Sequence, residues 1–402
     1  MADFFQNGII TTVHKIGDRP ISELERELKQ YSRKRPLALV LPSLYSELQG
    51  TALPKIIDEL EKIDYIQEIV IGLDRANKEE YEHTKEFFSR LPQYHRVIWQ
   101  DGPSMQKMND LLKERDLTIG EPGKGRNAWF CFGYVLAAGR TRAVAIHDCD
   151  ILTYDRNLLA RLYYPVANQN FGFKYCKGYY ARVSDSLNGR VVRLFITPLV
   201  RSLKRIIGQY DYLDYMDSFR YPLAGEFSMS VDVVETIRIP NDWGLEVGVL
   251  SEVFRNYSLK QICQVDVADN YDHKHQRLSA GDPNTGLSKM TIDIAKSIYR
   301  TLASMGVVFS EEFFRTIKAT YMRTAYDFVD KYYYDALING LKYDRHSEEE
   351  NVEVFIRSII MAGEQFLANP MEVPLIPSWR RVISAIPEFY DLLFKTIEED
   401  NQ

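Results

Sequence analysis

Short apolar segments alternate with helical segments along the first 150 residues, and this alternation constrains the fold more than any other feature of the chain. The apolar segments are short and continuous, as expected of strands that are buried on both faces. Strands separated by helices form βαβ units, in which the strands run parallel. The sequence therefore predicts an α/β fold with a mostly parallel, Rossmann-like sheet, with strands at residues 37–42, 68–73, 94–100 and 142–146 and helices at residues 53–62, 78–91 and 127–138.

The predicted strands place three aspartates at one edge of the sheet. Asp74 follows the second strand, and Asp148 and Asp150 follow the fourth. In open parallel sheets, ligands bind outside the carboxyl ends of the strands. We therefore expect the functional site at this edge.

The second half of the chain has a different pattern. Residues 165–270 mix strand-like and helical segments, whereas helical periodicity dominates from residue 287 onward. The expected strands cover residues 171–180 and 227–234, and the expected helices cover residues 190–205, 290–305, 311–334, 352–367 and 374–399, with the polar run 346–351 as a loop.

Charge and composition narrow the range of functions. The net charge is −6, and no cluster of lysines and arginines is dense enough to follow a phosphate backbone, so we do not expect a nucleic-acid partner. No apolar run approaches the roughly 20 residues that span a bilayer, and the N-terminal residues lack a signal-peptide pattern. The four cysteines show no Cys-x-x-Cys spacing, which favours a reducing compartment. We therefore expect a soluble cytoplasmic protein that does not bind membranes.

The motif Asp148-Cys149-Asp150 is the sharpest candidate for chemistry, because it follows a predicted buried strand directly. Two carboxylates at a strand end can both reach one divalent cation and the diphosphate oxygens attached to it. The same residues could instead cap a helix or form an Asx turn. Their position at the strand end favours the metal-binding interpretation.

Two segments offer basic groups at predicted helix starts. Residues 121–125 (Glu-Pro-Gly-Lys-Gly) combine flexible glycines with Lys124, which suits phosphate binding, although they lack the P-loop pattern and a plain Pro-Gly turn would explain them equally well. Gly189 and Arg190 precede a helical run and could bind an anion there. Arg190 could equally be a solvated surface charge.

Acidic and histidine residues complete the set of candidates. Gly225-Glu226 and the helical turn at Glu246 supply carboxylates, which compensation of a helix dipole would also explain. His273 and His275 lie in a polar loop, and an imidazole is a plausible third ligand for a cation beside two aspartates. Each of these features is weak when it is taken alone.

Together, and in this order, the motifs resemble those of the glucosyl-3-phosphoglycerate synthase family, which comprises retaining GT-A glycosyltransferases with mannosyl-3-phosphoglycerate and mannosylglycerate synthases as relatives. The resemblance runs from about Leu37 to Met290 and rests on residues 42–44, 122–125, 148–150, 189–191, 222–226, 243–246 and His273. It implies a GT-A nucleotide-diphospho-sugar transferase fold with four regions: an N-terminal extension (1–35), a nucleotide-sugar-binding half (36–165), an acceptor-binding half (166–290) and a helical C-terminal region (291–402).

The resemblance also implies a role for each matched position. Catalytic roles fall to Lys124, Asp150 and Glu246. The ligands of Mg²⁺ or Mn²⁺ would be Asp148, Asp150 and His273. The residues that bind the nucleotide-sugar donor would be Pro42, Ser43, Leu44, Glu47, Asp74, Lys124, Asp148, Cys149, Gly225 and Glu226. The residues that bind the acceptor would be Gly189, Arg190, Val192 and His275.

The activity that the resemblance implies is transfer of glucose from a nucleotide-diphosphate sugar to 3-phosphoglycerate, with retention of anomeric configuration, by a homodimer. A cation and Lys124 would stabilise the charge that develops on the leaving diphosphate, and Arg190 would orient a phosphorylated acceptor. Attack from the same face within an ion pair is our hypothesis for the mechanism.

Three departures from the family pattern leave the substrates open. Residues 45–47 (Tyr-Ser-Glu) stand where glucosyl-3-phosphoglycerate synthases usually carry Asn-Glu-Glu, which affects the choice between UDP and GDP and between glucose and mannose. Val192 stands where those enzymes place Thr. His275 replaces Asn in some relatives and competes with His273 as the metal ligand.

Other functions compete with this one. A mannosyl-3-phosphoglycerate or mannosylglycerate synthase would use GDP-mannose and, in the second case, unphosphorylated glycerate. A sugar-1-phosphate nucleotidyltransferase should carry a glycine-rich signature after the first strand, and residues 42–50 do not supply one. A non-catalytic sugar-nucleotide sensor, or an assembly protein that uses the helical tail, is a further alternative. Lys124, Asp150 and His273 argue against it, because a pure scaffold has no need of them.

Overall fold

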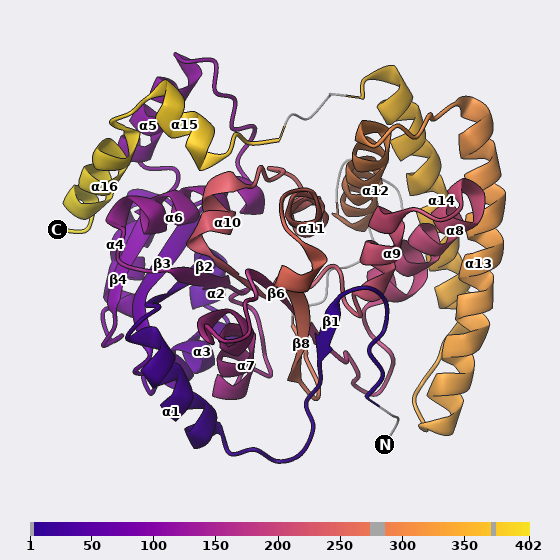
Figure 1. Ribbon diagram of the computed structural model, residues 1–402, viewed down its shortest axis with the longest axis horizontal. Coiled ribbons are helices and arrows are strands. Elements are labelled where there is room, and N and C mark those ends of the chain that lie inside the picture. The colour runs from indigo at the N-terminus through magenta and orange to yellow at the C-terminus, as the bar shows by residue number, and fades with distance from the viewer. Residues whose placement is uncertain (1–3, 274–285, 371–374) are drawn as a thin grey trace.

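A single eight-stranded sheet lies at the centre of the computed structural model, which describes residues 4–273, 286–370 and 375–402 (Figure 1). Its strand order is β1-β8-β6-β7-β5-β2-β3-β4. Neighbouring strands are parallel except where β7 pairs with β5 and β6. The predicted mostly parallel α/β fold is therefore confirmed. The strands are β1 (Thr11–Val13), β2 (Leu37–Leu44), β3 (Ile66–Asp74), β4 (Tyr94–Trp99), β5 (Ala143–Ile146), β6 (Tyr175–Tyr180), β7 (Phe227–Ser230) and β8 (Ile262–Ala268).

Two hydrophobic cores cover the two faces of this sheet. Successive residues of β2 divide between them, with Leu39 and Leu41 in one core and Ala38 and Val40 in the other. This division explains why β2 is apolar from Leu37 to Pro42. The first core is closed by α1 (Ile21–Ser32), α2 (Tyr45–Leu48), α3 (Ala52–Leu60), α4 (Lys78–Phe88) and α7 (Arg156–Ala167).

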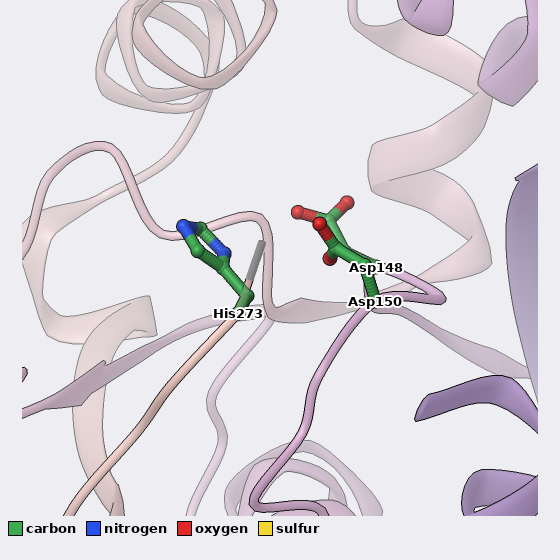
Figure 2. A group of neighbouring side chains, drawn as sticks. All are labelled: Asp148, Asp150 and His273. Atoms are coloured by element: carbon green, nitrogen blue, oxygen red, sulfur yellow. The ribbon is translucent and has the colours of Figure 1, made fainter. Parts of the chain in front are cut away.

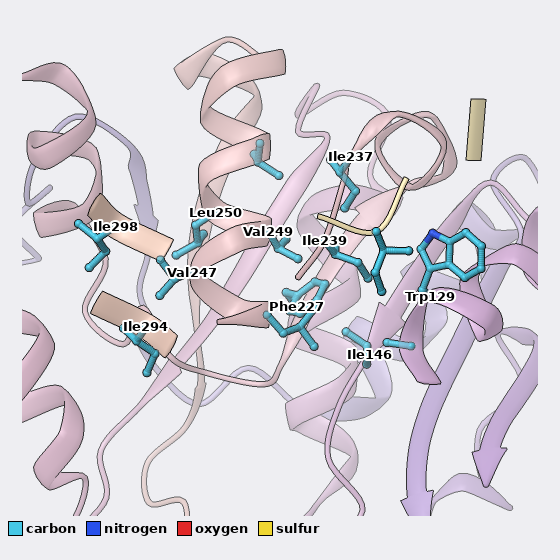
Figure 3. Close-up of a cluster of buried hydrophobic side chains, with 14 of the residues drawn as sticks. Trp129, Ile146, Phe227, Ile237, Ile239, Val247, Val249, Leu250, Ile294 and Ile298 are labelled. Carbon is cyan, nitrogen blue, oxygen red and sulfur yellow. The ribbon is translucent and has the colours of Figure 1, made fainter. Parts of the chain in front are cut away.

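The opposite face is packed by the helices that lie closest to the predicted site. In Figure 3, Val247 and Leu250 of α11 lie near Phe227 and Ile146 of the sheet, and all four belong to one buried cluster. The helices of this layer are α5 (Pro103–Lys113), α6 (Lys124–Ala138), α8 (Thr197–Ile207), α9 (Asp211–Ser218), α10 (Val231–Thr236) and α11 (Leu245–Asn256). A short helical turn, η2 (Leu259–Gln261), leads into β8.

The C-terminal helices divide into two groups (Figure 1). In the first group, α12 (Gly286–Ser304) and α13 (Glu311–Ile338) both pack against α14 (Arg345–Ala368), and α13 also packs against α8. The other two, α15 (Trp379–Ala385) and α16 (Phe389–Asp400), return to α5, α6 and α10. The prediction of a single helix at 374–399 is wrong. The helix is interrupted at Pro387, because proline lacks the backbone N–H that a helix interior needs. Among the described helices, none is both long enough and apolar enough to cross a membrane.

The polar run 346–351 is helical, and the prediction of a loop there is wrong. Asp344 caps α14 by accepting a hydrogen bond from the backbone N–H of Ser347 at 3.1 Å. Asn351 is buried and donates to the carbonyl of Ser347 at 2.6 Å. Capping and polar contacts therefore begin this helix before its apolar periodicity becomes visible.

Two strands were not predicted, because their sequences hide the usual pattern. β1 has three residues, and β8 carries Gln264 at its centre. The buried Gln264 side chain donates to Thr12 of β1 and to the backbone of Ser218. The segment expected as a helix at 190–205 begins as a π-helical turn, η1 (Val191–Ile196), and continues as α8.

The end of α16 covers the edge strand β4. The Asn401 side chain accepts from the N–H of Val97 and donates to its carbonyl, each at 2.9 Å. Glu398 forms an ion pair with Arg96 at 2.7 Å and accepts a hydrogen bond from Tyr94 at 2.6 Å. An amide side chain thus makes the two backbone hydrogen bonds that a ninth strand would make at this edge.

Candidate active site

The sheet brings three potential cation ligands together at its carboxyl edge (Figure 2). Asp148 and Asp150 follow β5, whereas His273 follows β8 and pairs with Ile151 in an isolated antiparallel bridge. One ligand atom from each of the three side chains lies within 4.8 Å of the others. Two distant segments of the sequence therefore meet where the parallel-sheet argument places a ligand.

The charges in this cluster suit a divalent cation. Burial, together with the carboxylates of Asp148 and Glu47, raises the pKa of Asp150 to about 7. Within the described part of the chain, Oδ1 of Asp150 is buried and accepts no hydrogen bond. Carboxylate oxygens and one imidazole nitrogen form a donor set that Mg²⁺ or Mn²⁺ accepts, and a cation would relieve the repulsion between the carboxylates. The residues present therefore fit the predicted metal.

Lys124 links this cluster to a second carboxylate. Its ammonium lies 2.6 Å from Oδ1 of Asp148 and 3.1 Å from Oε1 of Glu246. Although burial opposes its charge, these two carboxylates raise the pKa of Lys124. Lys124 in turn lowers the pKa of Asp148, whose burial acts in the opposite direction. The shifts of Lys124 and Asp148 therefore each favour the charged form, as expected of an ion pair.

Helix starts position the two ends of this ion pair. Lys124 begins α6, and Glu246 lies in the first turn of α11. Gly125 allows the two helix starts to approach, because a Cβ at this position would lie 2.1 Å from the carbonyl oxygen of Pro240. The helix dipole of α11 favours the negative charge of Glu246.

Glu226 is buried and interacts electrostatically with Asp148. Its side chain is fully buried, and its two oxygens accept hydrogen bonds from Tyr180 at 2.8 Å and Tyr271 at 2.6 Å. Burial, together with the charge of Asp148, raises the pKa of Glu226. The predicted donor contact by Glu226 does not fit this position. Gly225 packs directly against the Asp148 carboxylate, where a Cβ would lie 2.7 Å from Oδ2.

Four of the predicted donor residues, Pro42, Ser43, Leu44 and Asp74, lie at the ends of β2 and β3. Leu44 pairs with Asp74 across these strands, and Pro42 pairs with Gly72. Ser43 and Cys149 are buried, so their side chains contribute little exposed surface to a donor. A small cavity opens beside Asp74, and it is lined by Asp74, Gln100, Asp101, Pro122, Gly123, Arg126 and Asn127.

Asp74 was predicted from the sequence, whereas the other two charged residues of this cavity, Asp101 and Arg126, were not. Burial, together with Asp101, raises the pKa of Asp74, and burial lowers the pKa of Arg126. Arg126 comes two residues after Lys124, so its place in the first turn of α6 is a signal that the sequence does contain. Asp101 follows β4 at the same edge as Asp74.

The predicted acceptor residues lie on the loop that follows β6. Gly189 has a φ of +72°, a conformation that favours glycine, and its carbonyl accepts from the N–H groups of Val192 and Arg193 at the start of η1. Arg190 is half-buried beside Arg193, whose guanidinium forms an ion pair with Glu348 of α14 at 2.7 Å. The side chain of Val192 is buried in the hydrophobic core, which does not fit a side-chain contact with the acceptor. The predicted residue His275 lies outside the described residues.

A row of aromatic rings connects the loop at Gly189 and Arg190, where the acceptor was predicted to bind, to the three potential cation ligands. Tyr221 lies beside Gly189 and 4.7 Å from the ring of Tyr180, which stacks on Tyr271 at 3.8 Å. Tyr271 in turn meets the ring of His273 at 5.4 Å. The same group of packed aromatic rings thus contacts both the loop that carries Arg190 and the loop that carries His273.

Lys177 of β6 was also missed. Its side chain is 1% exposed, and its charge interacts with those of Glu246, Glu226, Lys124 and Asp148. A lysine in the middle of a strand that otherwise consists of aromatic and small residues is the sequence signal that could have revealed it.

Comparisons with known proteins identify relatives along the whole chain. No family model matches the chain. The chain is 49% identical over 401 residues to the glucosyl-3-phosphoglycerate synthase of Persephonella marina, which covers 100% of this chain and 99% of that protein. It is 39% identical over 404 residues to the protein of the same name from Methanococcoides burtonii, with 99% and 98% covered.

Solved structures share the fold. The crystal structure of mannosyl-3-phosphoglycerate synthase from Rubrobacter xylanophilus has a TM-score of 0.53 at 21% identity and covers 72% of this chain and 85% of that chain. That of glucosyl-3-phosphoglycerate synthase from Mycobacterium tuberculosis, in complex with Mn²⁺, UDP-glucose and phosphoglyceric acid, has a TM-score of 0.52 at 20% identity and covers 75% and 89%. With curated relatives aligned over the whole chain and a shared fold, this chain belongs to the glucosyl-3-phosphoglycerate synthase family of glycosyltransferases.

Proposed function

We propose that this enzyme transfers glucose from a nucleoside-diphosphate glucose to 3-phosphoglycerate and retains the anomeric configuration. One observation carries the proposal: Lys124 joins the carboxylates of Asp148 and Glu246 at the edge of a cation site, in a chain that is 49% identical to a glucosyl-3-phosphoglycerate synthase. Structures of the Mycobacterium tuberculosis enzyme hold Mg²⁺ with UDP, and Mn²⁺ with UDP-glucose and phosphoglyceric acid. These complexes support the same two substrates here.

The cation and Lys124 would act on the donor diphosphate. Asp148, Asp150 and His273 are the residues that would hold Mg²⁺ or Mn²⁺, which when bound supplies positive charge to the diphosphate oxygens. The ammonium of Lys124 lies beside Asp148, and in this proposal it turns from that carboxylate to the diphosphate when the donor binds. Positive charge placed where negative charge develops lowers the barrier to cleavage of the sugar–phosphate bond.

The bond changes follow a same-face substitution. The bond between the anomeric carbon and the diphosphate oxygen breaks, and its electron pair stays on the diphosphate. The hydroxyl oxygen of 3-phosphoglycerate attacks the same face of the anomeric carbon, and its proton passes to a diphosphate oxygen. Glu226 does not fit the role of a nucleophile, because it is buried and its two oxygens are held by tyrosines. Glu246, whose side chain is 14% exposed, remains to contact the sugar.

The acceptor phosphate would be held by the loop at Gly189 and Arg190. The guanidinium of Arg190 can bind phosphate through two parallel hydrogen bonds. The ion pair between Arg193 and Glu348 fixes the beginning of η1 on α14, so the loop presents Arg190 from a rigid base. An oriented phosphate brings the acceptor hydroxyl to the sugar.

The first experiment is a nucleotide-release assay with UDP-glucose, GDP-glucose and GDP-mannose. Each donor is combined with 3-phosphoglycerate or D-glycerate in the presence of Mg²⁺, and each reaction is repeated with excess chelator. We expect release from a glucose donor that requires both 3-phosphoglycerate and the metal. Turnover with GDP-mannose alone would assign the mannosyl reaction instead, and donor binding without turnover under every condition would favour a sensor.

The donor base is the finer question that this assay answers. Tyr45 follows the predicted base-binding residues, and its hydroxyl lies 2.9 Å from Nδ1 of His83. The pair places an aromatic ring and an imidazole near the end of β2. The UDP complexes of the Mycobacterium tuberculosis enzyme support UDP-glucose as the first donor to test.

The enzyme would act as a homodimer in the cytoplasm. The end of α13 exposes Tyr334, Leu337 and Ile338 by 63%, 65% and 85%, and we name these three residues the α13 tip. An apolar group of this kind at a helix end fits burial against a second copy of the chain. The four cysteines are buried and free, which supports a reducing compartment.

A further inference from the structure

Lys177 is a buried cation whose role no hydrogen bond explains. Its side chain is 1% exposed, and Nζ makes no hydrogen bond with any residue that the structure describes. Burial of an ammonium group without a partner is strongly unfavourable, so a lysine is a poor choice for filling this position. Methionine would occupy the same volume without that penalty.

Lys177 lies over an aromatic ring and within electrostatic reach of the candidate active-site charges. Its Nζ lies 5.1 Å from the centre of the Phe227 ring, which packs in the same core as Val247 of α11. The ammonium of Lys177 is attracted by the negative charges of Glu246, Glu226 and Asp148. It is repelled by the positive charge of Lys124. Burial lowers the pKa of Lys177 to about 8, which leaves the group mostly protonated at neutral pH.

Charge balance at the site changes when the donor binds. In this structure Lys124 contacts both Asp148 and Glu246. If Lys124 turns to the diphosphate, and Asp148 to the cation, Glu246 loses the ion-pair partner that it has here. An unpaired carboxylate beside a diphosphate would be repelled from the sugar.

We propose that Lys177 is a positioning residue, whose buried ammonium becomes the ion-pair partner of Glu246 when Lys124 turns to the donor diphosphate. This inference rests on the proposed function. Lys177 is too deeply buried to touch a substrate, so it acts through Glu246. Its charge attracts the Glu246 carboxylate and holds it in place beside the sugar.

The test is Lys177→Met, measured for transfer kinetics and for thermal stability, with Lys174→Met as the control. Lys174 lies just before the same strand but is half-exposed and forms an ion pair with Asp232. We expect Lys177→Met to lower kcat about tenfold or more with the KM for 3-phosphoglycerate unchanged within about twofold, since the lost interaction acts in the reaction and not in acceptor binding. The melting temperature should stay the same or rise, because an unpartnered buried charge is removed.

A double-mutant cycle separates this role from simple packing. If Lys177 acts through Glu246, Lys177→Met should change kcat by less than about twofold when Glu246→Gln is already present. Additive losses in the cycle, an unchanged kcat, or a fall in melting temperature parallel to the fall in activity would each overturn the proposal. A wild-type enzyme that transfers no glucose would instead overturn the proposed function, and this inference with it.

Discussion

At the scale of single residues, Lys124 and a bound cation would compete for the same carboxylate, that of Asp148. Lys124 holds Asp148 in the structure, although Asp148 also belongs to the cation cluster with Asp150 and His273. A cation that binds there must share Asp148 with the ammonium or displace it. The strength of cation binding and the position of Lys124 are therefore linked.

This link predicts the behaviour of Lys124→Met. Loss of a positive charge that faces the leaving diphosphate should lower kcat/KM by about 10²-fold to 10³-fold. Without metal, the variant should melt at a lower temperature than the wild type, because Asp148 and Glu246 lose their partner. Mn²⁺ should then raise its melting temperature by more than it raises that of the wild type.

Differential scanning calorimetry with and without Mn²⁺ checks the second part of this prediction. Lys78→Met is the control, since Lys78 is exposed at the start of α4. Equal Mn²⁺ shifts in Lys124→Met and the wild type would show that Lys124 and the cation do not compete for Asp148.

Arg190 gives a prediction about the choice of acceptor. Because a charged hydrogen bond to phosphate contributes about 1.5–3 kcal/mol, Arg190→Gln should raise the KM for 3-phosphoglycerate about tenfold or more. The KM for the donor should not change. Steady-state kinetics should also show a smaller preference for 3-phosphoglycerate over D-glycerate. Arg201→Gln on α8, whose partner is Asp217, should leave all three quantities unchanged; a lost donor affinity in Arg190→Gln would argue against an acceptor role.

At the scale of elements, the sequence predicted the strands and helices whose residues follow a local hydrophobic pattern. Strands near 37–42 and 68–73 are confirmed as β2 and β3, because burial on both faces leaves a continuous apolar run. β8 escaped prediction, since its buried Gln264 is satisfied by residues far away in the sequence. The same reason hid the tyrosines that hold Glu226. A local sequence pattern can predict that Asp148 and Asp150 lie at a strand end. It cannot show which residues, distant in the sequence, form hydrogen bonds with a buried charged group.

The packing of α16 on the sheet gives a prediction about pH. Although burial opposes its ionisation, hydrogen bonds from Arg96, Tyr134 and Tyr94 lower the pKa of Glu398 from 4.5 to about 2. The folded pKa lies below the unfolded one, so ionised Glu398 stabilises the fold above about pH 4.5 and loses this effect as the pH falls toward 2. Glu398→Gln should therefore lower the free energy of unfolding by about 2 kcal/mol at pH 7.

Urea unfolding at pH 7 and at pH 3 measures this effect. The difference between Glu398→Gln and the wild type should shrink at the lower pH. Glu399→Gln is the matched control, because Glu399 is 60% exposed and pairs with Lys395 at 3.7 Å. A difference of the same size at both pH values would mean that Glu398 acts by packing and not by its charge.

At the scale of the whole molecule, the C-terminal helices connect the acceptor loop to the proposed dimer surface. The turn after α13 carries Lys342, which forms an ion pair with Asp185 at 2.7 Å. Lys342 also pairs with Ser186 in an isolated parallel bridge. The α13 tip therefore lies a few residues from the segment that holds the acceptor loop in place.

This arrangement predicts the effect of Ile338→Asp. A charge in the α13 tip should convert a dimer of twice 46.8 kDa into a monomer, because a buried unpaired carboxylate opposes association. Light scattering coupled to size-exclusion chromatography measures the mass. Val308→Asp is the control, since Val308 and Ile338 are both 85% exposed but Val308 lies before α13. A wild-type protein that elutes as a monomer would contradict the homodimer.

Because the Asn401 side chain covers β4, this edge of the sheet is sensitive to deamidation of Asn401. Deamidation replaces its NH₂ group by an oxygen, which would face the carbonyl oxygen of Val97 and turn an attraction into a repulsion. The edge of β4 would then be open to pairing with another chain. In a stored sample, deamidation of Asn401 should therefore be detected by mass spectrometry before aggregates form.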